Sequence, residues 1–171
     1  MLEVQGDVDG LSPGAGHPIA GSTANHAEIV CVPKNLVTPI PEGVTPDHAA
    51  FATLGAIALQ GVRQAEVRLG EKILVIGLGL IGLLTVQILR AAGCRVLGID
   101  VDPRKVTLAG DLGCDRTIEA SADSLADEIL LFTGGYGIDA TIITAGTTSN
   151  EPIERAGEFT REKGVILVSP S

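Results

Sequence analysis

The sequence has few aromatic side chains: one Tyr, three Phe and no Trp among 171 residues, or 2%. Hydrophobic residues nevertheless make up 45% of it, so the chain can build a sizeable core, and that core must be aliphatic. Basic residues are also scarce, with 12 Lys and Arg against 21 Asp and Glu, which gives a net charge of −9. We therefore expect neither nucleic acid nor an anionic membrane surface as a partner.

Long uncharged apolar runs and targeting signals are absent as well. The most apolar stretch is interrupted by glycines and reaches Arg90 before it could span a bilayer. The N-terminus, Met-Leu-Glu, carries acids early, which a signal peptide does not. Three cysteines, Cys31, Cys94 and Cys114, are far apart and form no C-x-x-C pair, and the three histidines are isolated. We expect reduced thiols that are buried or half-buried, no metal-binding residues, and a cytoplasmic location.

The most informative segment runs from Lys72 to Gly82 and reads Lys-Ile-Leu-Val-Ile-Gly-Leu-Gly-Leu-Ile-Gly. Its apolar run predicts a buried strand that ends at Gly77 and passes directly into an apolar helix. A second predicted strand, 95–99, ends in Asp100. A G-x-G-x-x-G turn between strand and helix, with an acid about 20 residues further on, is typical of dinucleotide-binding domains. The alternative is a glycine-rich turn in another α/β protein.

Each residue of this turn has a predicted role. Gly77 permits the tight turn, Gly79 lets the backbone approach a pyrophosphate, and Gly82 lets the helix pack closely on the strand. The amides of Leu80 and Ile81 would point at the pyrophosphate from the positive end of the helix dipole.

Two further positions complete the predicted site. Asp100 would accept hydrogen bonds from the adenosine ribose and repel a 2′-phosphate, which selects NAD over NADP. Arg104 could soften that selection, and Asp100 could instead be a solvated acid at a strand end. Thr144, Ala145 and Gly146 follow a predicted strand at the carboxyl edge, where ligands of open α/β sheets bind. The alternative for these three residues is a plain strand-to-helix turn.

The organisation of the chain changes near residue 45. Residues 1–44 are rich in Gly and Pro, predict one strand at 27–33 and a shorter one near 17–20, and have too little apolar surface for a domain. At Thr45, a predicted N-cap before Pro46, a helix begins that should reach about Glu66.

Strands and helices then alternate. Strands are predicted at 72–76, 95–99, 115–118, 138–143 and 164–168, and helices at 80–92, 103–112, 122–132 and 150–161. This alternation predicts an α/β fold, a doubly wound parallel sheet with right-handed crossovers. A full Rossmann domain has six strands in the order 3-2-1-4-5-6. Only five are predicted here, so the sixth strand is missing.

The residues resemble a known family. Val32-Pro33, Ile40-Pro41 and Ala49-Ala50 are similar to the run-in to the cofactor domain of medium-chain dehydrogenases, the alcohol-dehydrogenase-like and quinone-reductase-like enzymes. The likeness continues through the glycine turn, Asp100, Lys105 and the segments 113–115 and 137–139. Residues 51–61 look most like a bacterial subgroup in which this half is fused to a second oxidoreductase domain.

The resemblance implies a domain organisation and further site residues. Residues 1–44 would be the truncated C-terminal piece of a GroES-like catalytic domain, and residues 45–171 an NAD-binding Rossmann domain that is incomplete at its C-terminus. Lys105 would lie beside the adenosine ribose, although an ordinary surface lysine is the alternative. Ser169 departs from the glycine that the family usually has after the last strand.

The resemblance also implies a function. The whole protein would transfer hydride between NAD(H) and an alcohol or carbonyl carbon of a small-molecule substrate, and would be a homo-oligomer. Zinc is possible in the full-length enzyme but not in this chain. Ala52, which cannot bind metal, stands where the family places a zinc ligand, so either the enzyme is of a zinc-free kind or that ligand comes from elsewhere. The chain alone would be inactive. A non-catalytic NAD(H)-sensing module and, less well matched, a methyltransferase are the alternatives.

Overall fold

The computed structural model describes residues 18–19 and 30–169, which fall into two units, Met1–Thr53 and Leu54–Ser171. The described part of the first unit contains a 3-10 turn, η1 (Lys34–Leu36), helix α1 (Pro46–Ala49) and an antiparallel bridge between Ile19 and Val37. Of the strand predicted at 27–33, residues 27–29 lie outside the described residues and residues 30–33 form no strand. Of that predicted near 17–20, only residues 18–19 are described, and Ile19 contributes the bridge.

The helix predicted from Thr45 begins as expected but is interrupted. The Thr45 hydroxyl accepts a hydrogen bond from the amide of His48 at 3.4 Å, and Pro46 occupies the first turn. The amide of Phe51 then bonds to the carbonyl of His48, only three residues back. This tighter turn ends the α-helical pattern, so α2 (Ala52–Gln64) is a separate helix.

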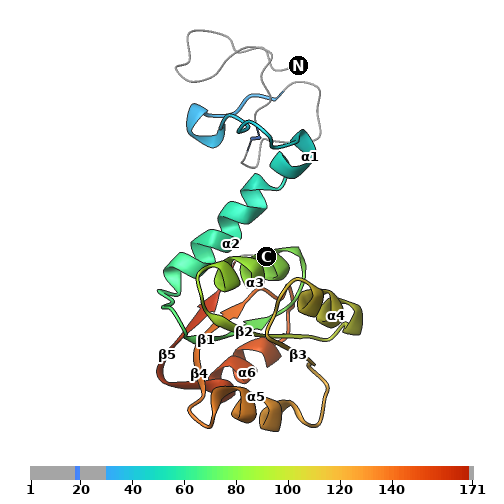
Figure 1. The fold of residues 1–171 in the computed structure, drawn as a ribbon, viewed down its shortest axis with the longest axis vertical. Helices are drawn as coiled ribbons and strands as arrows, with labels where there is room; N and C mark the ends of the chain where they lie inside the picture. The colour runs from blue at the N-terminus through green and yellow to red at the C-terminus, as the bar shows by residue number, and fades with distance from the viewer. Residues whose placement is uncertain (1–17, 20–29, 170–171) are drawn as a thin grey trace. The chain divides into compact units, whose positions relative to one another are not determined.

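Five parallel strands form one sheet in the second unit (Figure 1). They are β1 (Lys72–Ile76), β2 (Arg95–Asp100), β3 (Arg116–Glu119), β4 (Ile138–Ile143) and β5 (Thr160–Val168), in the order β3-β2-β1-β4-β5. The predicted doubly wound α/β fold is confirmed. Strand β5 begins earlier than predicted, because Thr160 pairs with Ile138 before the register shifts and Val165 pairs with Ala140.

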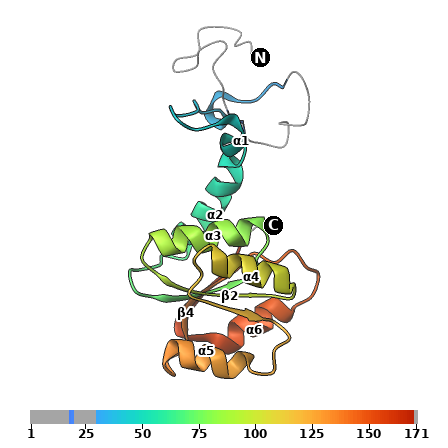
Figure 2. The same ribbon diagram turned by 45° about the vertical axis from the view of Figure 1, so that its right-hand side comes forward.

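Helices cover both faces of this sheet (Figure 2). Helices α3 (Leu80–Ala91) and α4 (Pro103–Asp111) pack on one face, and α5 (Leu125–Thr133) and α6 (Glu151–Phe159) on the other. Successive side chains of β1 enter opposite cores: Val75 joins the cluster under α3, and Leu74 joins the cluster over α5. Each fully buried aliphatic side chain of this kind contributes about 1.5–3 kcal/mol. None of the described helices is both long and apolar enough to cross a membrane.

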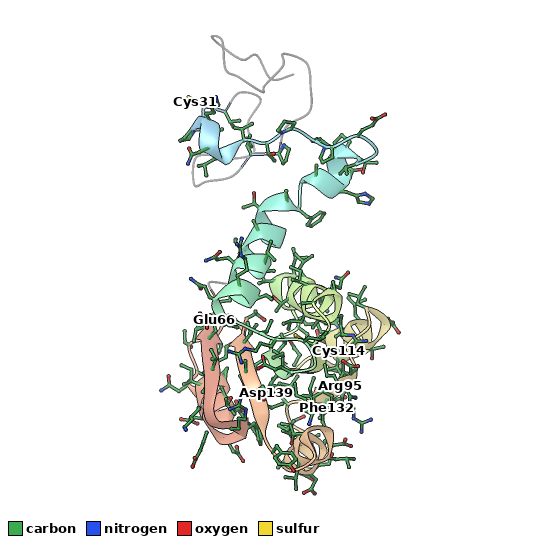
Figure 3. The ribbon with its side chains drawn as sticks, turned by 60° about the vertical axis from the view of Figure 1, so that its left-hand side comes forward. Cys31, Glu66, Arg95, Cys114, Phe132 and Asp139 are labelled. Atoms are coloured by element: carbon green, nitrogen blue, oxygen red, sulfur yellow. The ribbon has the colours of Figure 1, made fainter. Side chains whose placement is uncertain are left out.

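The three cysteines differ in exposure; Figure 3 labels Cys31 and Cys114. Cys94 is buried and Cys114 half-buried, as expected. Burial raises the pKa of the Cys114 thiol to about 11 and raises the pKa of Cys94 as well, so both stay protonated at neutral pH. The expectation is wrong for Cys31, which is exposed, because residues 30–33 form no strand for a layer to cover.

An ionic cluster joins three strands at the edge of the sheet where β1 begins. The carboxylate of Asp139, labelled in Figure 3, accepts hydrogen bonds from the amide of Lys72 and from Nε of Arg161, each at 2.8 Å. The Lys72 ammonium donates to the carbonyl oxygen of Thr133 at 2.7 Å. Burial alone would raise the pKa of the Asp139 carboxyl, but these hydrogen bonds outweigh it and hold the pKa below its ordinary value.

We expect this carboxylate to make the fold sensitive to acid. A lowered pKa in the folded state means that the stabilisation is present above the unfolded pKa of about 3.9 and is lost as the pH falls through the folded value. Asp139→Asn should therefore lower the free energy of unfolding by about 1–2 kcal/mol at pH 7, and by progressively less below pH 4. Urea denaturation at several pH values measures this. Asp111→Asn, a change at an exposed carboxylate on α4, is the control, and a pH-independent loss for Asp139→Asn would contradict the prediction.

Candidate functional site

A cavity of about 360 Å³ opens at the carboxyl ends of the strands, beside the glycine turn. The strand order reverses between β1 and β4, and ligands of open α/β sheets bind in the crevice at such a reversal. Seven of the ten predicted site residues line the cavity: Gly77, Gly79, Asp100, Lys105, Thr144, Ala145 and Gly146. The other three, Leu80, Ile81 and Gly82, lie in the first turn of α3 and do not line it.

Two positions of the turn require glycine for space. Gly77 has a φ of +96°, and a Cβ built there would lie 2.6 Å from the backbone nitrogen of Ala145. A Cβ on Gly82 would overlap the carbonyl oxygen of Gly77 and lie 2.9 Å from the hydroxyl oxygen of Thr144. The turn, the helix and the loop after β4 are thus packed backbone against backbone.

Gly79 differs from these two, because a Cβ built on it would meet no atom within 4 Å. It lines the cavity and is the N-cap of α3, with a φ of −70° that any residue could adopt. Leu80 and Ile81 follow it, and the first amides of a helix have no partner within the helix. The open space beside Gly79, at the N-terminus of α3, fits a pyrophosphate. A side chain at position 79 would fill that space.

Asp100 is built into the backbone around the cavity. Its side chain is buried, and its two oxygens accept hydrogen bonds from the amides of Leu78 at 2.6 Å and Asp102 at 2.8 Å. Nζ of Lys105 lies 3.8 Å from the same carboxylate. A carboxylate has about four acceptor positions, so it can accept from the amides of Leu78 and Asp102 and still accept from ribose hydroxyls. The sequence does not indicate the bond to the Leu78 amide, because Leu78 lies in a different turn from Asp100.

Thr144 also braces the glycine turn. Its buried hydroxyl donates to the carbonyl oxygen of Gly77 at 2.6 Å. That bond ties the end of β4 to the end of β1, while Ala145 packs on Gly77 and Gly146 stays exposed at the cavity.

The Arg104 side chain bonds to Asp102 and does not line the cavity. Its guanidinium is exposed and bonds to both oxygens of Asp102, at 3.1 and 2.9 Å. The side-chain hydrogen bond from Arg104 holds the pKa of the Asp102 carboxyl below its ordinary value. Arg104 is not among the residues that line the cavity.

The sequence analysis missed the wall that α6 contributes. Glu151 and Arg155 line the cavity together with Val101 and Ala120. Nη2 of Arg155 lies 3.5 Å from Oε1 of Glu151. Their i, i+4 spacing was visible in the sequence, but nothing local indicated that α6 lines the same cavity as the turn after β2.

Ser169 lies outside this cavity. Directly after β5, it is buried near Gly61, and its hydroxyl has no hydrogen-bond partner among the described residues.

No metal-binding cluster is found in the described part of the chain. Within residues 18–19 and 30–169, no three His, Cys, Asp or Glu side chains are grouped so that they could hold a metal ion. The described part of the chain therefore does not fit a zinc ion.

Comparisons with known proteins agree with this architecture. A family model described as zinc-binding dehydrogenase matches residues 81–169. An alcohol dehydrogenase from Rhizobium meliloti (strain 1021) is 35% identical over 114 residues, which cover 67% of this chain and 32% of that protein. The chain spans about a third of the length of the curated relatives it matches.

Solved structures show the same fold. The alcohol dehydrogenase TADH from Thermus sp. ATN1 superposes with a TM-score of 0.72 at 25% identity, over 79% of this chain and 41% of that one. A structure from Sinorhizobium meliloti 1021, which contains NADP, gives a TM-score of 0.71 at 29% identity, over 80% of this chain and 40% of that one.

Proposed function

The chain belongs to the zinc-binding dehydrogenase family, and from this we infer that it is the NAD(H)-binding domain of an alcohol-dehydrogenase-like oxidoreductase. In the whole protein, NAD(H) would exchange a hydride with the alcohol or carbonyl carbon of a small-molecule substrate. The observation that carries the proposal is the open backbone at Gly79, at a helix N-terminus and beside the buried carboxylate of Asp100.

The glycine turn would hold the pyrophosphate. Gly79 leaves room for it, and the amides of Leu80 and Ile81 would donate to its oxygens from the positive end of the α3 dipole. Gly77 and Gly82 act indirectly, since they allow the turn to pack against Ala145 and Thr144.

The adenosine ribose would lie at Asp100. Its carboxylate would accept the ribose hydroxyls, with Lys105 close by to balance its charge. The same negative charge disfavours a 2′-phosphate, and Arg104, the basic side chain next to Lys105, is already paired with Asp102. Both features favour NAD over NADP in this chain.

The wider organisation is part of the same proposal. Residues 1–44 would belong to the substrate-binding domain and residues 45–171 to the cofactor domain, in a cytoplasmic homo-oligomer. We assign none of the described residues to activation of the alcohol or carbonyl group, so the chain alone should not turn over substrate. No step is assigned to zinc.

Calorimetric titration tests the cofactor preference. We expect NADH to bind at least about tenfold more tightly than NADPH, equivalent to 1.4 kcal/mol, and Asp100→Ala to bring the two affinities to within about threefold. The same change removes the acceptor for the amides of Leu78 and Asp102, so it should also lower the free energy of unfolding by about 2 kcal/mol.

Asp111→Ala, a change at an exposed acid outside the cavity, is the control and should alter neither quantity. Each variant is titrated at a temperature where its denaturation curve shows it folded. Equal affinity of the unchanged protein for NADH and NADPH, or tighter binding of NADPH, would contradict the role given to Asp100.

A further inference from the structure

Helix α6 presents an ion pair to the cavity. Glu151 is in its first turn and Arg155 one turn later, and both side chains line the cavity. They lie 3.5 Å apart and are partly exposed, Arg155 by 33% and Glu151 by 59%. The pair is unlike the ion pair of Asp100 and Lys105, because Glu151 accepts no backbone amide in the described structure and is free to meet a ligand.

The position of this pair in the cavity indicates what it would meet, if the proposed function holds. The pyrophosphate would lie at Gly79 and the ribose at Asp100, so the adenine base extends beyond the ribose. Val101 follows Asp100 in the chain, the amide of Ala120 bonds to the carbonyl oxygen of Asp100, and both residues line the cavity together with Glu151 and Arg155 of α6. Val101 and Ala120 offer apolar contact to a flat base, and besides Asp100 and Lys105 the charged side chains that line the cavity are Glu151 and Arg155.

The chemistry of the polar edge of the base matches the pair. Adenine has an amino group at C6, which donates, next to the ring nitrogen N1, which accepts. An ionised Glu only accepts hydrogen bonds and an Arg only donates them, and hydrogen bonds to ionised groups are stronger than neutral ones.

We propose that Glu151 and Arg155 recognise the base of the cofactor, with Glu151 accepting from the amino group and Arg155 donating to N1. The pair makes the cavity specific for adenine rather than tolerant of any flat base. This inference rests on the proposed function, because it needs the dinucleotide in the cavity.

A cofactor analogue separates the pair's contact from the rest of the site. In nicotinamide 1,N6-ethenoadenine dinucleotide the etheno bridge blocks both N1 and the amino group and leaves the ribose and pyrophosphate unchanged. By calorimetry, we expect the protein to bind NAD about tenfold more tightly than the etheno analogue. Glu151→Ala and Arg155→Ala should each weaken NAD binding about tenfold and leave binding of the analogue within about twofold.

Glu154→Ala, a change on the same helix turn at a residue that does not line the cavity, is the control and should keep the full preference for NAD. Thermal unfolding curves establish that each variant is folded at the titration temperature.

Three results would overturn the inference, and the first two leave the proposed function intact. If NAD binds but the unchanged protein does not distinguish it from the etheno analogue, or if the variants weaken both equally, the pair only stabilises α6 and the proposed function stands. If NAD does not bind at all, the proposed function fails and the inference fails with it.

Discussion

Alanine in place of Gly82 is expected to destabilise the fold by about 2 kcal/mol, although alanine favours a helix by about 1 kcal/mol over glycine. The added Cβ would overlap the carbonyl oxygen of Gly77, a backbone atom that cannot rotate away. Helix α3 would have to move off β1 and loosen the bond from Thr144 to Gly77. The same displacement should abolish measurable NADH binding. Urea denaturation and calorimetry measure the two losses.

Gly110→Ala is the matched control for that change. Gly110 also lies in a helix, α4, but a Cβ there would meet only the hydroxyl oxygen of Thr117 at an ordinary 3.8 Å. This variant should be unchanged or more stable by up to about 1 kcal/mol. If Gly82→Ala also gained stability, the close packing of α3 on the glycine turn would be refuted.

Gly79→Ala, unlike Gly82→Ala, should weaken NADH binding strongly without lowering the stability of the fold. The new Cβ meets no protein atom within 4 Å and the φ of −70° suits alanine, so the melting temperature should stay within about 2 °C. The Cβ would occupy the space that the pyrophosphate needs. We therefore expect NADH affinity to fall about 100-fold, equivalent to 2.7 kcal/mol.

Calorimetry and thermal unfolding on one sample distinguish these effects. Gly157→Ala, on α6, adds a Cβ that likewise meets nothing within 4 Å, but away from the cavity; it should leave NADH binding unchanged and leave the melting temperature unchanged or higher. Unaltered NADH binding by Gly79→Ala would place the pyrophosphate elsewhere and remove the main support for the proposed function.

Elements with a strong local signal matched the sequence predictions. Strands β1 and β4 have the predicted boundaries, 72–76 and 138–143, because a buried β-branched run that ends in a turn is marked by nearby residues alone. The Thr45 cap is local in the same way. The interruption of the helix before Ala52 and the early start of β5 were missed. The latter depends on pairing with Ile138, a partner that only the folded sheet supplies.

The candidate site likewise has parts that the sequence predicts and parts that only the folded protein reveals. The sequence by itself determined the glycine turn, the acid at Asp100 and the loop after β4, because the strand–helix alternation brings the carboxyl ends of parallel strands to one edge. Only the tertiary structure decided that Asp100 holds the amides of two turns, that Thr144 braces Gly77, and that Glu151 and Arg155 wall the cavity. These contacts join residues far apart in the chain, and their partners depend on how the loops at the edge pack, which local periodicity does not encode.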